Sequence, residues 1–224
     1  MIALVIGARR GSLGAEIRRQ FTLPHHNSPP NLVITAGVSG DEMHELNILE
    51  PDMINHVISL VNPDVIICTV GVNLSTKPIG DPGWYADVAQ QTKINFLGPA
   101  LLMEAVASCP RVKKLIFISS NSAHIARRNS LGYCSSKAAL SMAVRCAARE
   151  WAGEPLVYAY ELGLLAGTPM TQATEAVFGP AQSRMVGAEN GLKVREVADA
   201  IVSDLRHSGM AYNGSTIRLD AGEQ

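Results

Sequence analysis

The first 21 residues constrain the fold most, because an apolar run, a glycine-rich turn and a helical segment follow one another directly. Residues 1–6 are apolar and predict a short buried strand, residues 7–14 contain Gly7, Gly11 and Gly14, and residues 15–21 have helical character. Glycine allows a tight turn and close backbone approach, and a helix N-terminus attracts an anion. This unit predicts a sheet that binds the pyrophosphate of a dinucleotide.

The rest of the chain alternates between predicted strands and predicted helices. Strands are expected at residues 31–36, 45–48, 65–71, 115–120, 155–160 and 214–219, and helices at 51–60, 83–107, 133–151 and 194–206, with 168–192 irregular. This alternation predicts an α/β fold with a Rossmann-like, doubly wound parallel sheet, in a single domain over 1–224. Only about ten residues separate Ala36 from Leu46, too few for a strand, helix and strand crossover.

Composition narrows the class of protein. The chain is 47% hydrophobic and 17% charged, with a net charge of −1, so its overall field favours neither nucleic acid nor an anionic membrane. The four cysteines show no C-x-x-C spacing and are expected to be buried and reduced, with no metal site. The apolar N-terminal run is too short for a signal peptide, and no stretch is long enough to cross a bilayer. We expect a cytoplasmic protein.

Tyr133 and Lys137 form the most informative pair of polar residues. If Tyr133 opens a helix, Lys137 lies one turn away on the same face, and its ammonium should stabilise the phenolate and lower the tyrosine pKa. Ser120, at the end of an apolar run, could hold a carbonyl or alcohol oxygen. Taken alone, such a tyrosine and lysine are often an ordinary surface pair. Combined with the glycine turn, they predict proton transfer beside a nicotinamide.

Five motifs in this order resemble the short-chain dehydrogenase/reductase family over nearly the whole chain. They are residues 65–71, 94–98, 115–120, 133–140 and 214–222, and the glycine turn at residues 7–14 precedes them. The resemblance implies a catalytic set of Asn95, Ser120, Tyr133 and Lys137. For Asn95, the alternative is a helix asparagine that satisfies backbone groups. The chain departs from the family pattern in its glycine spacing and in Leu162-Gly163, which stands where Pro-Gly is usual.

The choice of dinucleotide rests on two observations. Residues 35–39, at the end of the second strand, contain no carboxylate to take a ribose 2′-hydroxyl, and the next one is Asp41. Arg9 and Arg10 lie in the glycine turn, where NADP-dependent family members often carry a basic residue, although they could equally be solvated. NADP(H) is therefore favoured over NAD(H). The resemblance implies cofactor contacts from Gly7, Arg9, Arg10, Gly11, Ser12, Leu13, Gly14, Ser39, Asn47, Ile48, Gly71, Tyr133, Lys137 and Thr168.

The predicted function is NADP(H)-dependent hydride transfer between the nicotinamide and a carbonyl or secondary alcohol, as in a ketoreductase. The alternatives are a non-catalytic NADP-sensing regulator and an epimerase or dehydratase that uses the same tyrosine. His124, Arg127 and Arg128 either line the substrate entrance or are solvated, and Met170 and Met185 either cover the substrate or pack ordinarily. The family resemblance also implies a homodimer or homotetramer. A small-molecule substrate is the expected partner.

Overall fold

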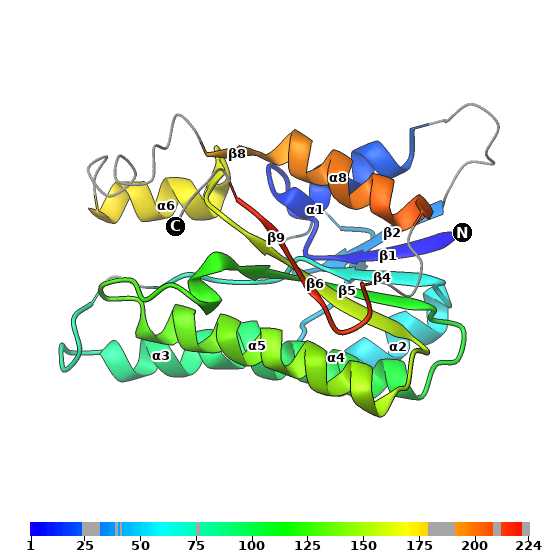
Figure 1. Cartoon of the computed structure of the whole chain (residues 1–224), viewed down its shortest axis with the longest axis horizontal. Coiled ribbons are helices and arrows are strands. Elements are labelled where there is room, and N and C mark those ends of the chain that lie inside the picture. Colours follow the sequence, from blue (N-terminus) through cyan, green and yellow to red (C-terminus); the bar gives the residue numbers. More distant parts are fainter. Residues whose placement is uncertain are drawn as a thin grey trace.

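Seven parallel strands form the central sheet of the computed structural model, in the order β3-β2-β1-β4-β5-β6-β9 (Figure 1). The structure describes residues 1–23, 32–38, 40, 42–74, 77–178, 191–207 and 212–220. The strands are β1 (Ile2–Ile6), β2 (Leu32–Gly37), β3 (His44–Glu45), β4 (Val65–Cys68), β5 (Lys114–Ser120), β6 (Leu156–Leu162) and β9 (Thr216–Leu219). Two short strands, β7 (Leu165–Ala166) and β8 (Leu192–Lys193), pair separately. The doubly wound parallel sheet predicted from the sequence is confirmed.

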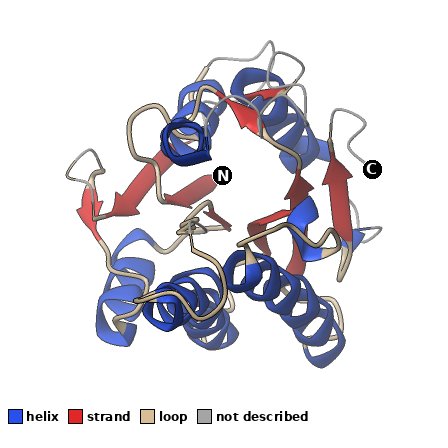
Figure 2. Ribbon diagram, turned by 90° about the vertical axis from the view of Figure 1, so that its left-hand side faces the viewer, coloured by secondary structure: helices blue, strands red, loops and turns tan. Residues whose placement is uncertain are grey.

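Helices cover both faces of this sheet (Figures 1 and 2). One face carries α1 (Leu13–Phe21) and α8 (Val194–His207), which pack against each other. The other carries α2 (Pro51–Val61), α4 (Gly98–Ala107) and α5 (Leu131–Glu150), with α3 (Trp84–Thr92) packed beside α5. The short turn η1 (Lys93–Leu97) precedes α4, and the short turn η2 (Asn121–Ala123) follows β5. The helix α6 (Pro169–Phe178) follows β7.

Alternate residues of the buried strands build the two cores. In β1, Ala3 and Val5 pack with the core under α1 and α8, whereas Leu4 and Ile6 pack with the core under α2, α4 and α5. Because both faces are covered, the strand is apolar throughout rather than alternating with polar residues. All strands of the central sheet run in the same direction. Their carboxyl ends therefore meet at one edge, where a doubly wound fold binds its ligand.

The connection between β2 and β3 lacks a helix, as the sequence predicted. The two strands are parallel, with Ala36 opposite His44 and Gly37 opposite Glu45, so only residues 38–43 join them. Parallel neighbours usually need about a dozen residues or more for this crossover. β3 spans only His44–Glu45, so it is shorter than the strand that the sequence predicted at residues 45–48.

Three expectations need correction. Part of the segment expected to be irregular forms α6, whose first helical residue is Pro169. The long helix expected over 83–107 is interrupted by a π-helical turn, η1. Of the cysteines, Cys68 is buried, but Cys146 lies at an exposed position of α5. Among the helices described, none is both long and apolar enough to cross a membrane.

Candidate active site

The glycine-rich turn forms the first side of the site, directly after β1. Gly7 has a φ of +89° and donates its backbone N–H to the Ala36 carbonyl at 2.9 Å, which ties the turn to the end of β2. Gly11 also has a positive φ of +78°, and the Ser12 N–H donates to the Arg9 carbonyl at 2.9 Å. This local turn lies where the spacing of Gly7, Gly11 and Gly14 is one residue longer than the usual family spacing. Glycine is favoured at both positions because other residues are strained there.

The start of α1 is formed by Ser12 and Gly14. The Ser12 hydroxyl accepts the Ala15 N–H at 3.3 Å and caps the helix. A Cβ at Gly14 would lie 2.6 Å from Thr69 Oγ1 and 2.8 Å from the Gly7 carbonyl oxygen, so only glycine lets the helix approach β4 this closely. The Leu13 side chain is buried in the core under α1 and α8. Only the backbone of Leu13 is therefore available to a ligand.

Arg9 and Arg10 are both exposed, beside the glycine turn. The 2′-phosphate contact expected from these two arginines stays a prediction. A Cβ at Gly37, the last residue of β2, would lie only 2.5 Å from Glu42 Oε1. The Glu42 carboxylate thus folds back onto the end of β2. Sequence reasoning missed this residue because it stands five positions beyond the strand end.

Asn47 and Ile48, two of the predicted cofactor contacts, lie in different environments. The Asn47 side chain accepts the Leu49 N–H at 3.1 Å and forms the turn before α2. Ile48 is a core residue, and a Cβ at Gly98 would lie 2.8 Å from Ile48 Cγ2. Ser39 lies outside the described residues, as does Met185.

Ser120 and Tyr133 come together at the carboxyl end of β5 and the first turn of α5, and their side chains are hydrogen-bonded. Ser120 Oγ also accepts the Ser122 N–H at 3.2 Å. Burial raises the pKa of the Tyr133 phenol, while the bond to Ser120 and the nearby Arg127 charge act in the opposite direction. The prediction that this serine and tyrosine would meet is consistent with the geometry.

Lys137 lies beneath the Tyr133 ring, with its Nζ 5.9 Å from the ring centroid. Its ammonium donates to the Ile118 carbonyl at 2.9 Å, and burial lowers the pKa of this lysine to about 8. The side chain is 3% exposed. The expected lowering of the Tyr133 pKa is not seen, because the cost of burying the phenolate outweighs the favourable charges around it. A Cβ at Gly71 would lie 3.2 Å from Lys137 Nζ, so the loop after β4 completes the floor of this cluster.

Asn95 occupies the middle of the π-helical turn η1 and is fully buried. Its Oδ1 accepts the Val72 N–H at 2.8 Å, and its Nδ2 donates to the Val72 carbonyl at 2.9 Å and to Ser136 Oγ at 3.1 Å. The side chain therefore satisfies backbone groups, which is the alternative that the sequence left open. It also joins the loop after β4 to α5. Single π turns are frequent at functional sites.

Thr168 is buried and lies at the start of α6. Its hydroxyl accepts the Thr171 N–H at 3.2 Å and is 2.9 Å from Thr171 Oγ1. The side chain therefore caps the helix. A Cβ at Gly11 would lie 3.8 Å from Pro169 Cγ, so the start of α6 adjoins the glycine-rich turn. The chain thus brings Thr168 to the predicted cofactor side.

A buried polar network behind the catalytic cluster was not predicted. Glu161, in β6, is 2% exposed and accepts the Ser141 hydroxyl at 2.8 Å, and its second oxygen lies 2.9 Å from His124 Nε2. Ser141 Oγ is 2.9 Å from Ser119 Oγ, and Ser119 directly precedes Ser120. The sequence signal was a single carboxylate within an apolar strand.

The loop between β5 and α5 carries the residues proposed for the substrate entrance. Arg127 is partly buried and donates to Ser122 Oγ at 3.1 Å and to Asn121 Oδ1 at 3.3 Å, whereas Arg128 is exposed. His124 is bound to Glu161, as described above. Two hydrogen bonds therefore hold Arg127 against the segment directly after Ser120, whereas Arg128 is exposed.

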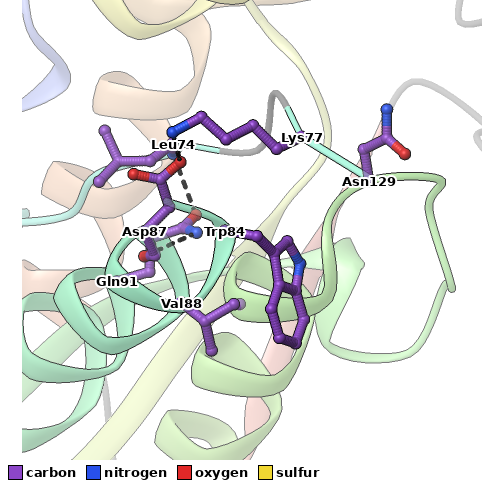
Figure 3. Close-up of a pocket in the computed structure, with 8 residues that line it drawn as sticks. Leu74, Lys77, Trp84, Asp87, Val88, Gln91 and Asn129 are labelled. Carbon is purple, nitrogen blue, oxygen red and sulfur yellow. Dashed lines mark hydrogen bonds and ion pairs between the residues drawn. The ribbon is translucent and has the colours of Figure 1, made fainter. Parts of the chain in front are cut away.

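A small pocket lies between the loop after β4, the start of α3 and the turn before α5 (Figure 3). Asp87 and Lys77 form an ion pair at 2.8 Å on one side, and Gln91 accepts the Leu74 N–H at 3.0 Å (Figure 3). Its lining residues are Leu74, Lys77, Trp84, Asp87, Val88, Gln91, Asn129 and Gly132. Gly132 directly precedes Tyr133, so the pocket adjoins the catalytic helix. No group of three or more metal-binding side chains occurs among the residues that the structure describes.

Comparisons with known proteins agree with this geometry. A family model described as enoyl-(acyl carrier protein) reductase matches residues 46–223. No curated protein matches the sequence. Among solved structures with the same fold, ligand-free aldohexose dehydrogenase from Thermoplasma acidophilum is 20% identical, with a TM-score of 0.80 over 99% of this chain and 92% of that chain. A tyrosine-to-phenylalanine variant of ElxO with NADPH bound is 16% identical, with a TM-score of 0.82 over 99% of this chain and 97% of that chain. A small-chain dehydrogenase in complex with NADPH is 18% identical, with a TM-score of 0.79 over 99% of this chain and 97% of that chain. The chain belongs to the short-chain dehydrogenase/reductase family of oxidoreductases.

Proposed function

We propose that the protein transfers hydride between NADP(H) and a small carbonyl or secondary alcohol substrate. The observation that carries the proposal is the meeting of Ser120, Tyr133 and Lys137 with the glycine-rich turn at one edge of the sheet. A hydroxyl donor, a phenol and an ammonium in one cluster can protonate a developing alkoxide. The turn next to them suits a pyrophosphate at the N-terminus of α1.

The residues at the turn fit a dinucleotide on structural grounds. Gly11 is exposed and has a φ of +78°. The atom nearest to a Cβ added at this position would be Pro169 Cγ, at 3.8 Å, so the backbone of Gly11 is open to a ligand. Arg9 and Arg10 lie beside it and can pair with a 2′-phosphate. The NADPH bound in two of the similar structures supports the same choice.

In the direction of reduction, the bound nicotinamide would supply the hydride, which carries both electrons to the carbonyl carbon. Ser120 donates a hydrogen bond to the carbonyl oxygen, and Tyr133 gives that oxygen its proton, so the product is an alcohol. Lys137, with its pKa lowered to about 8, is still largely protonated at neutral pH and can restore the phenol through its ammonium. Asn95 holds the loop of Gly71 against this lysine.

The test is to measure oxidation of NADPH with a panel of carbonyl compounds for the wild type and for Tyr133→Phe. We expect the variant to lose about 10²-fold or more in kcat, because the proton donor is gone, while its affinity for NADPH stays within about threefold of wild type. Tyr212→Phe is the matched control, since Tyr212 is 39% exposed and lies just before β9. Turnover by Tyr133→Phe at the wild-type rate would contradict the mechanism. NADPH binding without turnover of any substrate would favour the sensing alternative.

We further propose that the protein is a cytoplasmic homo-oligomer that assembles through the layer containing α3 and α5. Exposed apolar side chains on this layer support assembly: Tyr85 on α3, Leu97 in η1 and Met142 on α5 are 76%, 45% and 51% exposed. Their burial between copies would remove apolar surface from water. Light scattering of the purified protein, compared with that of Met142→Glu, tests the proposal.

A further inference from the structure

We infer that Glu161 is a positioning residue for the proposed reaction, because its carboxylate holds the segment after Ser120 in place through His124. This inference rests on the proposed function, and it adds a residue that acts through another side chain rather than on the substrate. Glu161 is 2% exposed and is the single charged residue of β6. A buried carboxylate destabilises a fold unless hydrogen bonds satisfy it, so the partners of Glu161 indicate its role.

The Glu161 carboxylate binds side chains from two other elements. In the pairing of β5 with β6, Glu161 lies opposite Ser119, which directly precedes Ser120. His124 Nε2 lies 3.0 Å from Glu161 Oε1 and 2.9 Å from Oε2, and it donates because a carboxylate only accepts hydrogen bonds. The Ser141 hydroxyl, on α5, donates to Oε1 at 2.8 Å. The carboxylate therefore joins β6 both to the segment after β5 and to α5.

The contact with His124 fixes the turn η2, which directly follows Ser120. The His124 N–H donates to the Asn121 carbonyl at 3.0 Å, so the backbone of His124 is tied to this turn. In the same turn, the Ser122 N–H donates to Ser120 Oγ at 3.2 Å. The Ser120 hydroxyl is in turn bonded to that of Tyr133. Holding His124 against β6 therefore holds the N–H that orients the Ser120 hydroxyl.

This arrangement affects the rate because a hydroxyl that binds a developing alkoxide must be held in position. Misplacing a group by about 1 Å can lower a rate by about 10²-fold. The His124 side chain is 52% exposed, so its removal takes away little packing besides the contact with Glu161. The contacts described above lie on β5, β6 and α5, whereas the glycine-rich turn follows β1. Loss of the His124–Glu161 contact should therefore slow turnover and leave dinucleotide affinity unchanged.

The first experiment compares His124→Ala with His124→Gln in NADPH oxidation with the carbonyl panel and in NADPH titration by nucleotide fluorescence. The amide nitrogen of glutamine can take the place of the imidazole Nε2 and donate to the carboxylate, whereas alanine has no donor. We expect His124→Ala to lose about tenfold in kcat with an NADPH dissociation constant within about threefold of wild type, and His124→Gln to keep kcat within about threefold. His56→Ala is the matched control, since His56 is exposed on α2.

A double variant tests whether the two side chains act as one unit. Adding Glu161→Gln to His124→Ala should lower kcat no further, because the contact between them is already lost.

Hydrogen exchange over residues 121–130 gives a second readout that needs no substrate. Without dinucleotide, we expect the amides of this segment to exchange about tenfold faster in His124→Ala than in the wild type, because the hydrogen bond to a charged partner is gone. In His124→Gln and in His56→Ala the exchange should match the wild type.

The outcomes separate this inference from the proposed function. Wild-type exchange or wild-type kcat in His124→Ala overturns the role of Glu161, as does an equal loss of kcat in His124→Ala and His124→Gln, and each leaves the proposed function intact. If the wild type oxidises NADPH with no carbonyl compound, the proposed function fails, and exchange over residues 121–130 still decides whether Glu161 holds the segment. Loss of kcat in His124→Ala that glutamine restores, with exchange changed in parallel, supports the inference.

Discussion

Burial of the Lys137 ammonium should lower the stability of the folded chain, and replacing this lysine with methionine should recover part of the loss. Burial lowers its pKa from 10.5 to about 8, a difference of about 2.5, and each unit corresponds to about 1.4 kcal/mol, so the burial penalty is about 3 kcal/mol. Below pH 8 both the folded and the unfolded chain hold the proton, and the penalty is present in full. Between pH 8 and 10.5 the folded chain releases the proton first, so the wild-type free energy of unfolding rises with pH.

Methionine has a similar length but no charge, so Lys137→Met removes the penalty. It also removes the hydrogen bond to the Ile118 carbonyl, which offsets the gain by about 1 kcal/mol. We therefore expect the free energy of unfolding of Lys137→Met to exceed that of the wild type by about 2 kcal/mol at pH 7. By pH 9.5 the wild type has recovered about 2 kcal/mol, and the advantage of the variant should be nearly gone.

Urea denaturation in the absence of dinucleotide, at pH 7 and at pH 9.5, measures both values. The control is Lys93→Met, because Lys93 is exposed and its loss should leave the pH dependence of unfolding unchanged. An advantage for Lys137→Met that is equal at the two pH values would refute the reasoning, and so would a variant less stable than wild type at pH 7.

Substitutions at three further positions test the contacts around the site. Gly14→Ala should lose about 2 kcal/mol of stability and bind NADPH more weakly, since its methyl group would meet Thr69 Oγ1 at 2.6 Å; thermal unfolding and a binding titration check this. Asn95→Ala should lower the free energy of unfolding by about 2 kcal/mol in urea, because the Val72 N–H and carbonyl lose their hydrogen-bond partner. Glu161→Ala should cost about 3 kcal/mol in the same assay, and Glu161→Gln less, because the amide can still accept the Ser141 hydroxyl. Equal stability of the alanine and glutamine variants at position 161 would show that the network is not the cause.

The sequence predicted the doubly wound parallel sheet, and it predicted that Ser120, Tyr133 and Lys137 would lie close together, because both follow from local patterns. An apolar run ending in a serine, and a tyrosine one helical turn before a lysine, are each set by short-range geometry. The sequence also predicted that no crossover helix follows β2, because the number of residues in a connection can be counted without the structure.

What the sequence did not reveal depends on contacts between distant residues. Glu42 Oε1 lies where a Cβ of Gly37 would come within 2.5 Å of it, and burial in the folded chain raises the pKa of Tyr133. The pairing of Glu161 with His124 joins residues 37 positions apart in the chain. No periodicity reports such pairings, because they arise from tertiary packing rather than from a helix or strand repeat.

Ser120, Tyr133 and Lys137 lie on two elements, β5 and α5, that polar contacts join into one unit. Lys137 donates to the Ile118 carbonyl, and Ser119 Oγ donates to the Lys137 carbonyl at 3.3 Å, so the end of β5 and the first turns of α5 are linked in both directions. Ser120 is the next residue of β5, and Tyr133 is one turn before Lys137. The relative position of serine and phenol is therefore fixed by the fold before a substrate arrives, and donors held in place need no reorganisation as the alkoxide develops. The burial penalty of Lys137 is consistent with this arrangement, because a site that orients charge in a dry environment gives up stability to do so.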